Sequence, residues 1–312
     1  MEREVLEFDV QFIGAGPAGL AGAIHLASLI ASRDAAIAAG APGKPLGEVT
    51  IAVLEKAASV GAHGISGAVL DPKALAELIP DYRAQGCPIE SDVTREDVYF
   101  MWERGQFRLP IVPPMLENHG CHILSLGNLV AWLARIAEAK GVLVATETPA
   151  ARAIVENGRV LGVVAGDKGV NKQGERKPNY QPGAECRAKA TVLCEGPRGT
   201  IARSLEGPLG LTAGKNAQVY STGVKELWEL PPGRVEKGRV IHTLGYPLPA
   251  ETFGGGFVYG MSDTHWSVGF VTGLDYRDPT TDPPRRSRKA GSGRCRSSQP
   301  TACCCAATAA GS

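Results

Sequence analysis

The first residues of the chain carry apolar patterns separated by a glycine-rich turn and a loop. Residues 8–13 (FDVQFI) predict a short buried strand, and the apolar residues 17–32 that follow the glycine turn predict a helix. The Ala/Gly/Pro-rich stretch 33–48 predicts a surface loop. Residues 49–56 (VTIAVLEK) predict a second strand that ends at Glu55. Together these elements have the order of a βαβ unit.

A helical period returns in the middle of the chain. Between Leu126 and Gly141, large or small apolar side chains recur at helical spacing, at Leu129, Trp132, Leu133, Ile136 and Ala137. Gly141 is placed as the C-terminal stop of this helix. Residues 142–146 (VLVAT) then predict another strand, so strand and helix patterns continue to alternate.

The next stretch has the pattern of a hairpin. Residues 151–166 predict two strands joined at Asn157-Gly158, which is the strongest short-range hairpin signal. The polar residues 167–185 predict a loop, and residues 189–194 (KATVLC) predict a strand that runs into a second glycine-bearing turn.

The pattern changes after Tyr220 to longer β-like segments at residues 239–248, 254–261 and 265–274. They predict an antiparallel sheet that forms a second layer, inserted into or appended to the first domain. Residues 285–312 have almost no bulky apolar side chain and no period, so we expect a disordered tail. This string resembles the product of a shifted reading frame in a GC-rich gene, and we expect it to be unrelated to the preceding fold.

These patterns predict three parts. Residues 1–215 form a nucleotide-binding domain, residues 216–284 form an incomplete β-rich domain, and residues 285–312 form the tail. With 33 basic and 32 acidic residues the net charge is only +1, which offers no electrostatic case for binding nucleic acid. The N-terminus lacks the features of a signal or transit peptide, and we expect no membrane-spanning helix. Attachment to a membrane surface remains open.

The cysteines and histidines do not form a recognisable catalytic or metal-binding pattern. Four of the eight cysteines are scattered singly, without C-x-x-C spacing, and are expected to be free thiols; they are Cys87, Cys121, Cys186 and Cys194. The other four follow residue 294, and the adjacent Cys303, Cys304 and Cys305 could hardly surround one metal ion. Lone histidines such as His63, His119 and His122 are expected to be structural.

The glycine turn after the first strand has the spacing G-x-G-x-x-G. Gly14 permits the tight turn, Gly16 lets the backbone approach a pyrophosphate, and Gly19 lets helix and strand pack closely. The helix N-terminus offers unpaired N–H groups and a partial positive charge to the phosphates. Glu55, at the end of the second strand, is the acid expected to accept the ribose hydroxyls. The motif in this context predicts dinucleotide binding.

Four stretches of the sequence favour FAD among the dinucleotides. The turn GAGPAGL, the Glu55-Lys56 pair and the hairpin IVENGRVLGVVAG resemble FAD-containing proteins, and CEGPRG, with Glu195 and Gly196, resembles a second FAD signature. The resemblance implies an α/β fold: a Rossmann-like FAD-binding domain of the glutathione-reductase type with an inserted antiparallel β-sheet on the quinone side and a disordered C-terminal tail.

Longer strings resemble one family, the electron-transfer flavoprotein–ubiquinone oxidoreductases. They lie at residues 55–89, 112–142, 221–261 and 268–279, in the family's order, and the resemblance covers about residues 8–279. It implies electron transfer from reduced electron-transfer flavoprotein, through a [4Fe-4S] cluster and FAD, to ubiquinone. It also implies a monotopic membrane protein, at the cytoplasmic side of a bacterial inner membrane or, in eukaryotic relatives, at the mitochondrial inner membrane.

The resemblance also implies roles for particular residues. The FAD pyrophosphate loop is Gly14, Ala15, Gly16, Pro17, Ala18 and Gly19. Gly61, Ser66 and Gly67 match the stretch beside the flavin ring, for which a glycine-rich turn is the alternative. Gly254 and Gly255 match paired glycines beside the quinone, and a bulge or strand kink is the alternative. Residues 60–81 match the membrane-dipping segment, although a short amphipathic helix is more often ordinary core packing.

The chain also departs from the family pattern. The cysteines that hold the cluster and a later glycine-rich segment that closes the FAD site are absent, so we expect no cluster and weak FAD binding. Two alternatives stay open. One is an FAD-dependent hydroxylase or prenyl reductase with the same nucleotide fold, and the other is a non-catalytic fragment that lies at a membrane surface.

Overall fold

The computed structural model describes residues 2–65, 69–171, 173–276 and the backbone of 303–305. The chain divides into two compact units, each built from two separate segments. Unit 1 contains residues 1–64 and 127–216, and unit 2 contains residues 65–126 and 217–312. Residues 65–126, which the sequence patterns placed in the first domain, therefore belong to the second unit.

Unit 1 is built on a six-stranded sheet with the order β8-β2-β1-β13-β10-β9. Its parallel strands are β1 (Val5–Ile13), β2 (Ile51–Leu54), β8 (Leu143–Ala145) and β13 (Glu185–Leu193). The hairpin of β9 (Ala150–Glu156) and β10 (Arg159–Ala165) joins β13 in the antiparallel direction and confirms the predicted Asn157-Gly158 turn.

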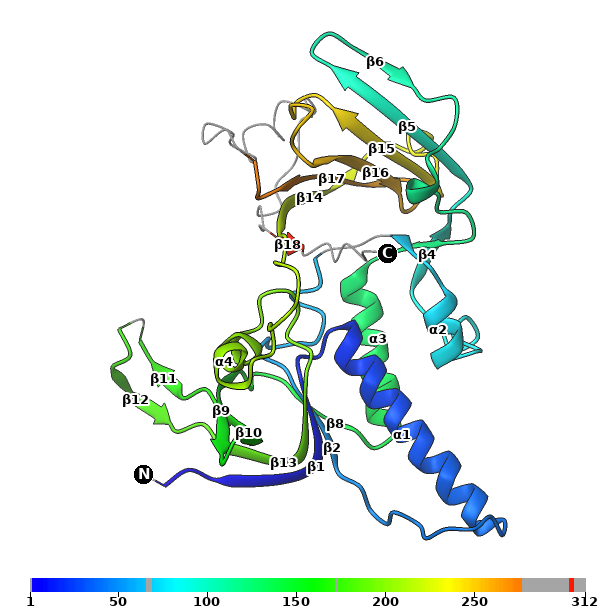
Figure 1. The fold of residues 1–312 in the computed structure, drawn as a ribbon. Coiled ribbons are helices and arrows are strands. Elements are labelled where there is room, and N and C mark those ends of the chain that lie inside the picture. The colour runs from blue at the N-terminus through cyan, green and yellow to red at the C-terminus, as the bar shows by residue number, and fades with distance from the viewer. Residues whose placement is uncertain (1, 66–68, 172, 277–302, 306–312) are drawn as a thin grey trace. The chain divides into compact units, whose positions relative to one another are not determined.

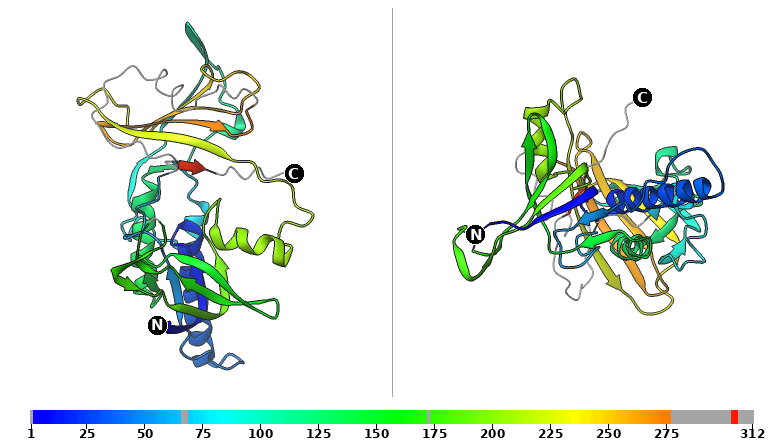
Figure 2. Two further views of the ribbon diagram at one scale, coloured as in Figure 1. Left: turned by 90° about the vertical axis from the view of Figure 1, so that its left-hand side faces the viewer. Right: turned by 90° about the horizontal axis from the view of Figure 1, so that it is seen from below.

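Helices α1 (Pro17–Ala38) and α3 (Leu126–Ala139) lie on the same side of this sheet (Figures 1 and 2). The strand order explains this, because β1, β2 and β8 follow one another across the sheet and right-handed crossovers place both helices on one face. Among the described helices, α1 is long and apolar enough to cross a membrane. It begins at the glycine turn, and its Leu20 and Ile24 are completely buried in the unit, as in a core helix of the nucleotide fold.

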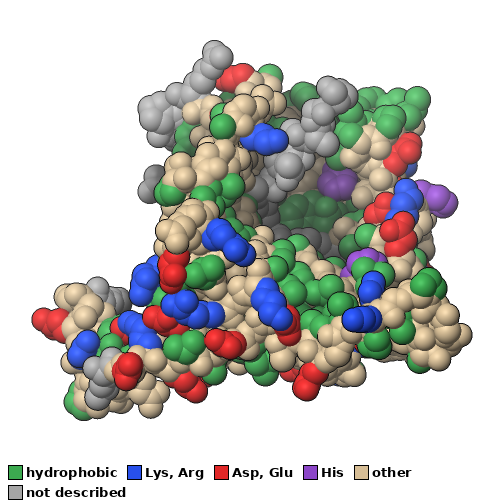
Figure 3. All heavy atoms as spheres, turned by 60° about the horizontal axis from the view of Figure 1, so that its bottom comes forward, with side chains coloured by type: hydrophobic (Ala, Val, Ile, Leu, Met, Phe, Trp, Pro, Cys, Tyr) green, Lys and Arg blue, Asp and Glu red, His purple; other side chains and the backbone are tan. Residues whose placement is uncertain are grey.

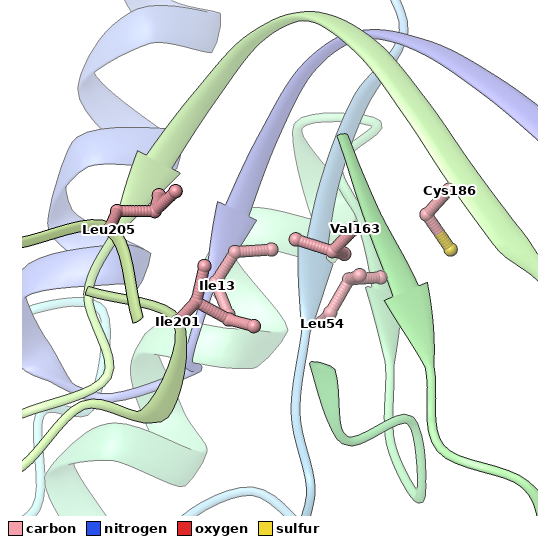
Figure 4. Packing of buried hydrophobic residues seen from close by; sticks show 6 residues of the cluster. All are labelled: Ile13, Leu54, Val163, Cys186, Ile201 and Leu205. Atoms are coloured by element: carbon pink, nitrogen blue, oxygen red, sulfur yellow. The ribbon is translucent and has the colours of Figure 1, made fainter. Parts of the chain in front are cut away.

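The core of unit 1 includes a cluster contributed by β1, β2, β10, β13 and a helix that follows the second glycine turn, α4 (Thr200–Leu209) (Figure 4). Its members are Ile13, Leu54, Val163, Cys186, Ile201 and Leu205. The sequence patterns missed α4, although its Ile201 and Leu205 are buried at helical spacing.

Three predicted boundaries in unit 1 were wrong. Helix α1 continues to Ala38, because the alanine-rich residues 33–38 favour helix in spite of the glycines and prolines that follow. The predicted loop at 167–185 contains a small hairpin of β11 (Lys168–Val170) and β12 (Arg176–Gln181). Strand β13 begins at Glu185, not at 189, because its whole length pairs with β1.

Figure 3 shows acidic and basic side chains interspersed on one face, in keeping with the balanced charge.

Unit 2 contains a seven-stranded sheet with the order β18-β14-β17-β16-β15-β5-β6. Its strands are β5 (Arg95–Trp102), β6 (Gly105–Arg108), β14 (Ser221–Glu229), β15 (Arg239–Gly245), β16 (Gly254–Gly260), β17 (His265–Gly273) and β18 (Cys303–Cys305). The antiparallel layer was predicted, but β5 and β15 pair in parallel. These two strands come from different chain segments, so no hairpin dictates their relative direction. Residues 285–312, which the sequence predicts to be disordered, lie outside the described residues except for the backbone of β18.

A smaller sheet in unit 2 consists of β3 (Val69–Leu70), β7 (His122–Leu124) and β4 (Ile89–Asp92). Ile123 of β7 packs with Val240 of β15 and Met261 in the core of the unit. The unit also contains α2 (Lys73–Leu78) and a 3-10 turn, η1 (Pro114–Leu116). Within residues 60–81, Leu75 of α2 and the following Ile79 are buried and Leu78 is half-buried.

Candidate functional site: a nucleotide cradle and a glycine pair

The candidate nucleotide site lies at the carboxyl ends of β1, β2 and β13. The N–H of Gly14 donates to the carbonyl of Leu54 over 2.8 Å, and the N–H of Cys194 donates to the carbonyl of Ile13 over 2.9 Å. The three turns that follow these strands therefore meet at one edge of the sheet, where open α/β sheets bind their ligands. We call residues 14–19 together with Glu55 the nucleotide cradle.

The three glycines of the motif differ in what surrounds them. Gly14 has a φ of +107°, and a Cβ there would lie 2.5 Å from the carbonyl oxygen of Cys194. A Cβ on Gly19 would collide with the carbonyl oxygen of Gly14. A Cβ on Gly16 would meet no atom within 4 Å, and the backbone of Gly16 is extended, at a φ of −78°. Gly14 and Gly19 are thus required by the fold, whereas the space at Gly16 is open to a ligand.

The N-terminus of α1 adds donors to this open space. Gly16 is the N-cap, Pro17 follows, and neither a capping side chain nor an acidic residue occupies the first turn. The first intrahelical bond runs from the N–H of Leu20 to the carbonyl of Gly16 over 3.1 Å, so the amides of Ala18 and Gly19 have no acceptor inside the helix. This end of the helix carries partial positive charge and suits a phosphate.

Glu55 lies beside this turn and is held by backbone donors. One carboxylate oxygen accepts the N–H of Ala15 over 2.9 Å and the other accepts the N–H of Ala57 over 2.8 Å. A carboxylate oxygen can accept more than one hydrogen bond, so both retain capacity for hydroxyl donors. The structure thus brings Glu55 to the pyrophosphate turn, and its ribose contact stays a prediction. The neighbouring Lys56 is exposed.

Glu195 of the second FAD signature caps a helix in the structure. Its carboxylate accepts the N–H groups of Thr200, Ile201 and Ala202 over 2.9–3.1 Å and so caps α4. Gly196 next to it has a φ of +78°, which favours glycine. An acid shortly before a small-residue turn and an amphipathic segment is the signal by which the sequence could have revealed this helix.

Gly61 is explained by a close contact that the sequence analysis missed. Its φ is +89°, and a Cβ there would collide with the carbonyl oxygen of Gly127 at the start of α3. Gly64 is similarly close, since its Cβ would lie 3.1 Å from the Cα of Gly127. The turn at 61–64 therefore packs against a third glycine. Ser66 and Gly67, predicted beside the flavin, lie outside the described residues.

In unit 2, Gly254 and Gly255 open strand β16. Gly254 has a φ of +147°, and a Cβ on it would collide with the carbonyl oxygen of Val271. A Cβ on Gly255 would collide with the carbonyl oxygen of Thr243. The close approach of β15, β16 and β17 is thus sufficient reason for both glycines, and their place beside a quinone stays a prediction.

A half-buried polar pair lies on the same sheet. His242 of β15 contacts Tyr259 of β16, with 3.0 Å between Nε2 and the hydroxyl oxygen. Burial lowers the pKa of His242 from its ordinary value, while the charge of Glu96 opposes this change. Burial also raises the pKa of Tyr259, so both side chains are held neutral.

The four cysteines whose side chains the structure describes are free thiols. Cys87 and Cys186 are buried, Cys121 and Cys194 are half-buried, and burial raises the pKa of each thiol. Within the described ranges, no group of three His, Cys, Asp or Glu side chains is arranged to hold a metal ion. These residues do not fit an iron–sulfur cluster, whose ligands are thiolates gathered around one centre.

Comparison with known sequences finds similar proteins of one family. The family described as ETF-QO, ubiquinone-binding, matches residues 220–292. The electron transfer flavoprotein-ubiquinone oxidoreductase of Pseudomonas aeruginosa is 41% identical over 288 residues, covering 91% of this chain and 50% of that protein. Over about nine-tenths of its length the chain is similar to electron transfer flavoprotein-ubiquinone oxidoreductases. The mitochondrial member from Dictyostelium discoideum is 40% identical, over 92% of this chain and 45% of its own length. The chain thus spans about half the length of the curated relatives it matches.

Solved structures with lower identity confirm the fold. A geranylgeranyl bacteriochlorophyll reductase-like protein from Thermoplasma acidophilum superposes with a TM-score of 0.60 at 18% identity, covering 92% of this chain and 62% of that one. A halogenase variant solved in complex with FAD gives a TM-score of 0.55 at 16% identity, covering 91% of this chain and 55% of that one. The predicted Rossmann-like flavoprotein fold is confirmed.

Proposed function

We propose that this chain binds FAD at the nucleotide cradle and serves electron transfer from reduced electron-transfer flavoprotein to ubiquinone. The observation that carries the proposal is the open backbone at Gly16, beside the uncapped N-terminus of α1 and next to Glu55. The similarity of nine-tenths of the chain to electron transfer flavoprotein-ubiquinone oxidoreductases supports the donor, the acceptor and a location at the respiratory membrane. It favours this function over the hydroxylase and prenyl reductase alternatives.

The residues present fit FAD. The amides of Ala18 and Gly19, with the bare backbone of Gly16, would hold the pyrophosphate, and Glu55 would accept the ribose hydroxyls. The bound flavin supplies the redox chemistry, and the protein supplies binding and orientation. Gly14 and Gly19 keep the turn tight enough for the phosphates to meet backbone and not side chain.

Gly254 and Gly255 are the proposed quinone-side residues. The carbonyl oxygens of Val271 and Thr243 fill the Cβ positions of these glycines, so the proposal rests on the match to the relatives and not on open space at the glycines. His242 and Tyr259 on the same sheet are held neutral by burial. No step is assigned to an iron–sulfur cluster, since the described residues do not fit one.

A titration with FAD tests the cradle. Gly16→Ala places a methyl group in open space, so its thermal midpoint should match that of the parent, while FAD affinity falls about tenfold or more because the methyl occupies the phosphate position. Gly207→Ala is the matched control, because a Cβ there also meets no atom within 4 Å but lies on α4. Flavin fluorescence and visible absorbance report binding.

Turnover completes the test. The FAD-loaded chain, mixed with reduced electron-transfer flavoprotein and a water-soluble short-tailed ubiquinone, should oxidise the donor and reduce the quinone, and Gly16→Ala should lower the rate in parallel with occupancy. Equal FAD affinity in Gly16→Ala and Gly207→Ala would refute the cradle. Full FAD occupancy without quinone reduction would refute the electron-transfer proposal.

A further inference from the structure

The segment that matches the ubiquinone-binding family carries a pair of protic side chains within its sheet. The match covers residues 220–292, and it includes His242 of β15 and Tyr259 of β16. The Nε2 of His242 lies 3.0 Å from the hydroxyl oxygen of Tyr259, and both side chains are half-buried. Reduction of a quinone to a quinol takes up two protons as well as two electrons. A protic pair in this segment is therefore a candidate proton donor.

The pairing register places further polar side chains on the same face of the sheet. Val240 of β15 pairs with Glu96 of β5 on one side and with Tyr259 on the other, and Tyr259 pairs with Ser267 of β17. Residues directly opposite each other on paired strands share a face, and His242 shares it because it lies two residues after Val240. One face thus carries an acid, an imidazole and two hydroxyl groups on four successive strands.

The hydroxyl of Ser267 indicates that this face accepts a further polar group. Ser267 is completely buried, and its Oγ has no hydrogen-bond partner among the described residues. Buried hydroxyl groups in native proteins are nearly always hydrogen-bonded. The oxygens of a quinone are acceptors of the kind that such a hydroxyl can meet.

His242 has one ring nitrogen left for a ligand. Tyr259 contacts Nε2, and no hydrogen bond joins Nδ1 to any residue that the structure describes. Burial lowers the pKa of His242, and Glu96 is the charged group that opposes this change. With the Tyr259 hydroxyl donating to Nε2, the neutral imidazole carries its proton at Nδ1. A neutral imidazole N–H can donate to an oxygen on which negative charge develops.

The register also places the pair near the proposed quinone-side glycines. His242 pairs with Phe257, which follows Gly255 by two residues on β16. Diagonal neighbours on paired strands are about 7–8 Å apart, a span that long or aromatic side chains bridge. The ring of Phe257 leans the other way, over β17, where it occupies the place of a Cβ on Gly269.

We propose that His242 donates a proton to ubiquinone as the quinone is reduced, with Tyr259 as its positioning residue. The inference rests on the proposed function, since it concerns the acceptor of that reaction. Two electrons reach the quinone from the reduced electron-transfer flavoprotein. The Nδ1 proton moves to one quinone oxygen and forms an O–H bond, while the hydroxyl proton of Tyr259 moves to Nε2. Tyr259 regains a proton from water, and water also protonates the second quinone oxygen, so one quinone, two electrons and two protons give one quinol.

Kinetics of a His242 variant test the proton transfer. The FAD-loaded chain is supplied with reduced electron-transfer flavoprotein and a water-soluble short-tailed ubiquinone. His242→Gln keeps a hydrogen-bond donor but cannot relay a proton, so kcat should fall about 100-fold or more while KM changes less than about threefold. The residual rate of the variant should rise as pH falls and should be increased by imidazole buffer, because external acids then supply the proton.

His265→Gln is the matched control in the same segment. His265 begins β17, and its Nδ1 lies 3.0 Å from the hydroxyl of Ser262 and 2.9 Å from that of Thr264 in a turn. Both ring positions of this control are thus set apart from the His242 pair, and its kcat and KM should stay within about twofold of the parent.

Infrared spectra of the bound quinone give a readout that does not depend on turnover. The carbonyl band of ¹³C-labelled short-tailed ubiquinone should lie at a lower frequency in the parent than in His242→Phe, which removes the donor. Thermal midpoints and FAD affinities of the variants are measured alongside. They should match those of the parent for His242→Gln, so that a lower kcat reports the lost proton and not a damaged fold.

The outcomes separate this inference from the proposed function. Quinone reduction by the parent with equal kcat in His242→Gln would overturn the inference and leave the proposed function standing. An identical carbonyl band in the parent and His242→Phe would overturn it too, as would a fall in kcat that only follows a loss of FAD affinity. Failure of the parent to reduce the quinone refutes the proposed function, while the carbonyl band still decides whether His242 contacts the quinone.

Discussion

At the scale of single residues, one motif contains glycines that are present for different reasons. Gly14 and Gly19 have no room for a side chain. A Cβ on Gly14 would meet the carbonyl of Cys194, and a Cβ on Gly19 would meet the carbonyl of Gly14. A Cβ on Gly16, in contrast, would meet no atom within 4 Å. The fold thus explains two of the three motif glycines, and ligand binding is the reason left for the third.

This difference predicts opposite results for two similar substitutions. Gly19→Ala must push the carbonyl of Gly14 aside, and we expect a loss of about 2–3 kcal/mol in the free energy of unfolding. Gly16→Ala should change it by less than about 0.5 kcal/mol. Urea titrations of both variants give the measurement. A Gly19→Ala chain as stable as Gly16→Ala would contradict the packing account.

His242 gives the chain a predicted pH dependence. Burial lowers the pKa of His242 in the folded chain below its unfolded value of about 6.5. As pH falls below the unfolded pKa of His242, the unfolded chain therefore takes up a proton at this residue before the folded chain does. The free energy of unfolding is unaffected by His242 above that pKa and decreases as pH falls below it.

His242→Gln retains a hydrogen-bonding partner for Tyr259 but does not titrate. Its midpoint of denaturation should fall less steeply than that of the parent between about pH 7.5 and pH 5.5. Parallel pH profiles for parent and variant would contradict a neutral, buried His242.

At the scale of elements, the parallel pairing of β5 with β15 depends on one acid. Asp97 of β5 is buried and is approached by Arg95 on its own strand, Arg108 on β6 and Arg239 on β15. Asp97 joins strands from two separate chain segments, and no sequence pattern near Asp97 predicts this pairing. Hydrophobic alternation alone does not determine which strand becomes the neighbour of β15.

Asp97→Ala should weaken this junction. Removing one member of a buried ion cluster leaves the arginines without their shared acceptor, and we expect a loss of about 2–4 kcal/mol in the free energy of unfolding. Glu156→Ala is the control, since Glu156 pairs with Arg187 at 3.5 Å on the surface and should cost less than about 0.5 kcal/mol. Equal stabilities of the two variants in urea would show that the cluster is not structural.

At the scale of the whole molecule, each compact unit combines two segments that are distant in sequence. Residues 65–126 leave unit 1 after the turn at 61–64 and return to it at α3, and they supply β5, β6 and β7 to unit 2. Local sequence patterns predict helices and strands but not which distant segments join in one unit. The closure of a long loop produces no periodic pattern in the sequence. The predicted division at residue 215 therefore differs from the division into units.

The sequence by itself determined the nucleotide fold, its glycine turn and the acid at the end of the second strand. These features depend on local backbone geometry and periodic burial, which short patterns record. It also carried the strings that identify the family. Only the tertiary structure decided that Glu195 caps α4, that Gly61 packs on Gly127, and that Leu75 and Ile79 are buried while Phe100 and Trp102 are exposed. Burial depends on which distant segments pack together, and an apolar side chain has the same identity in the core and at the surface.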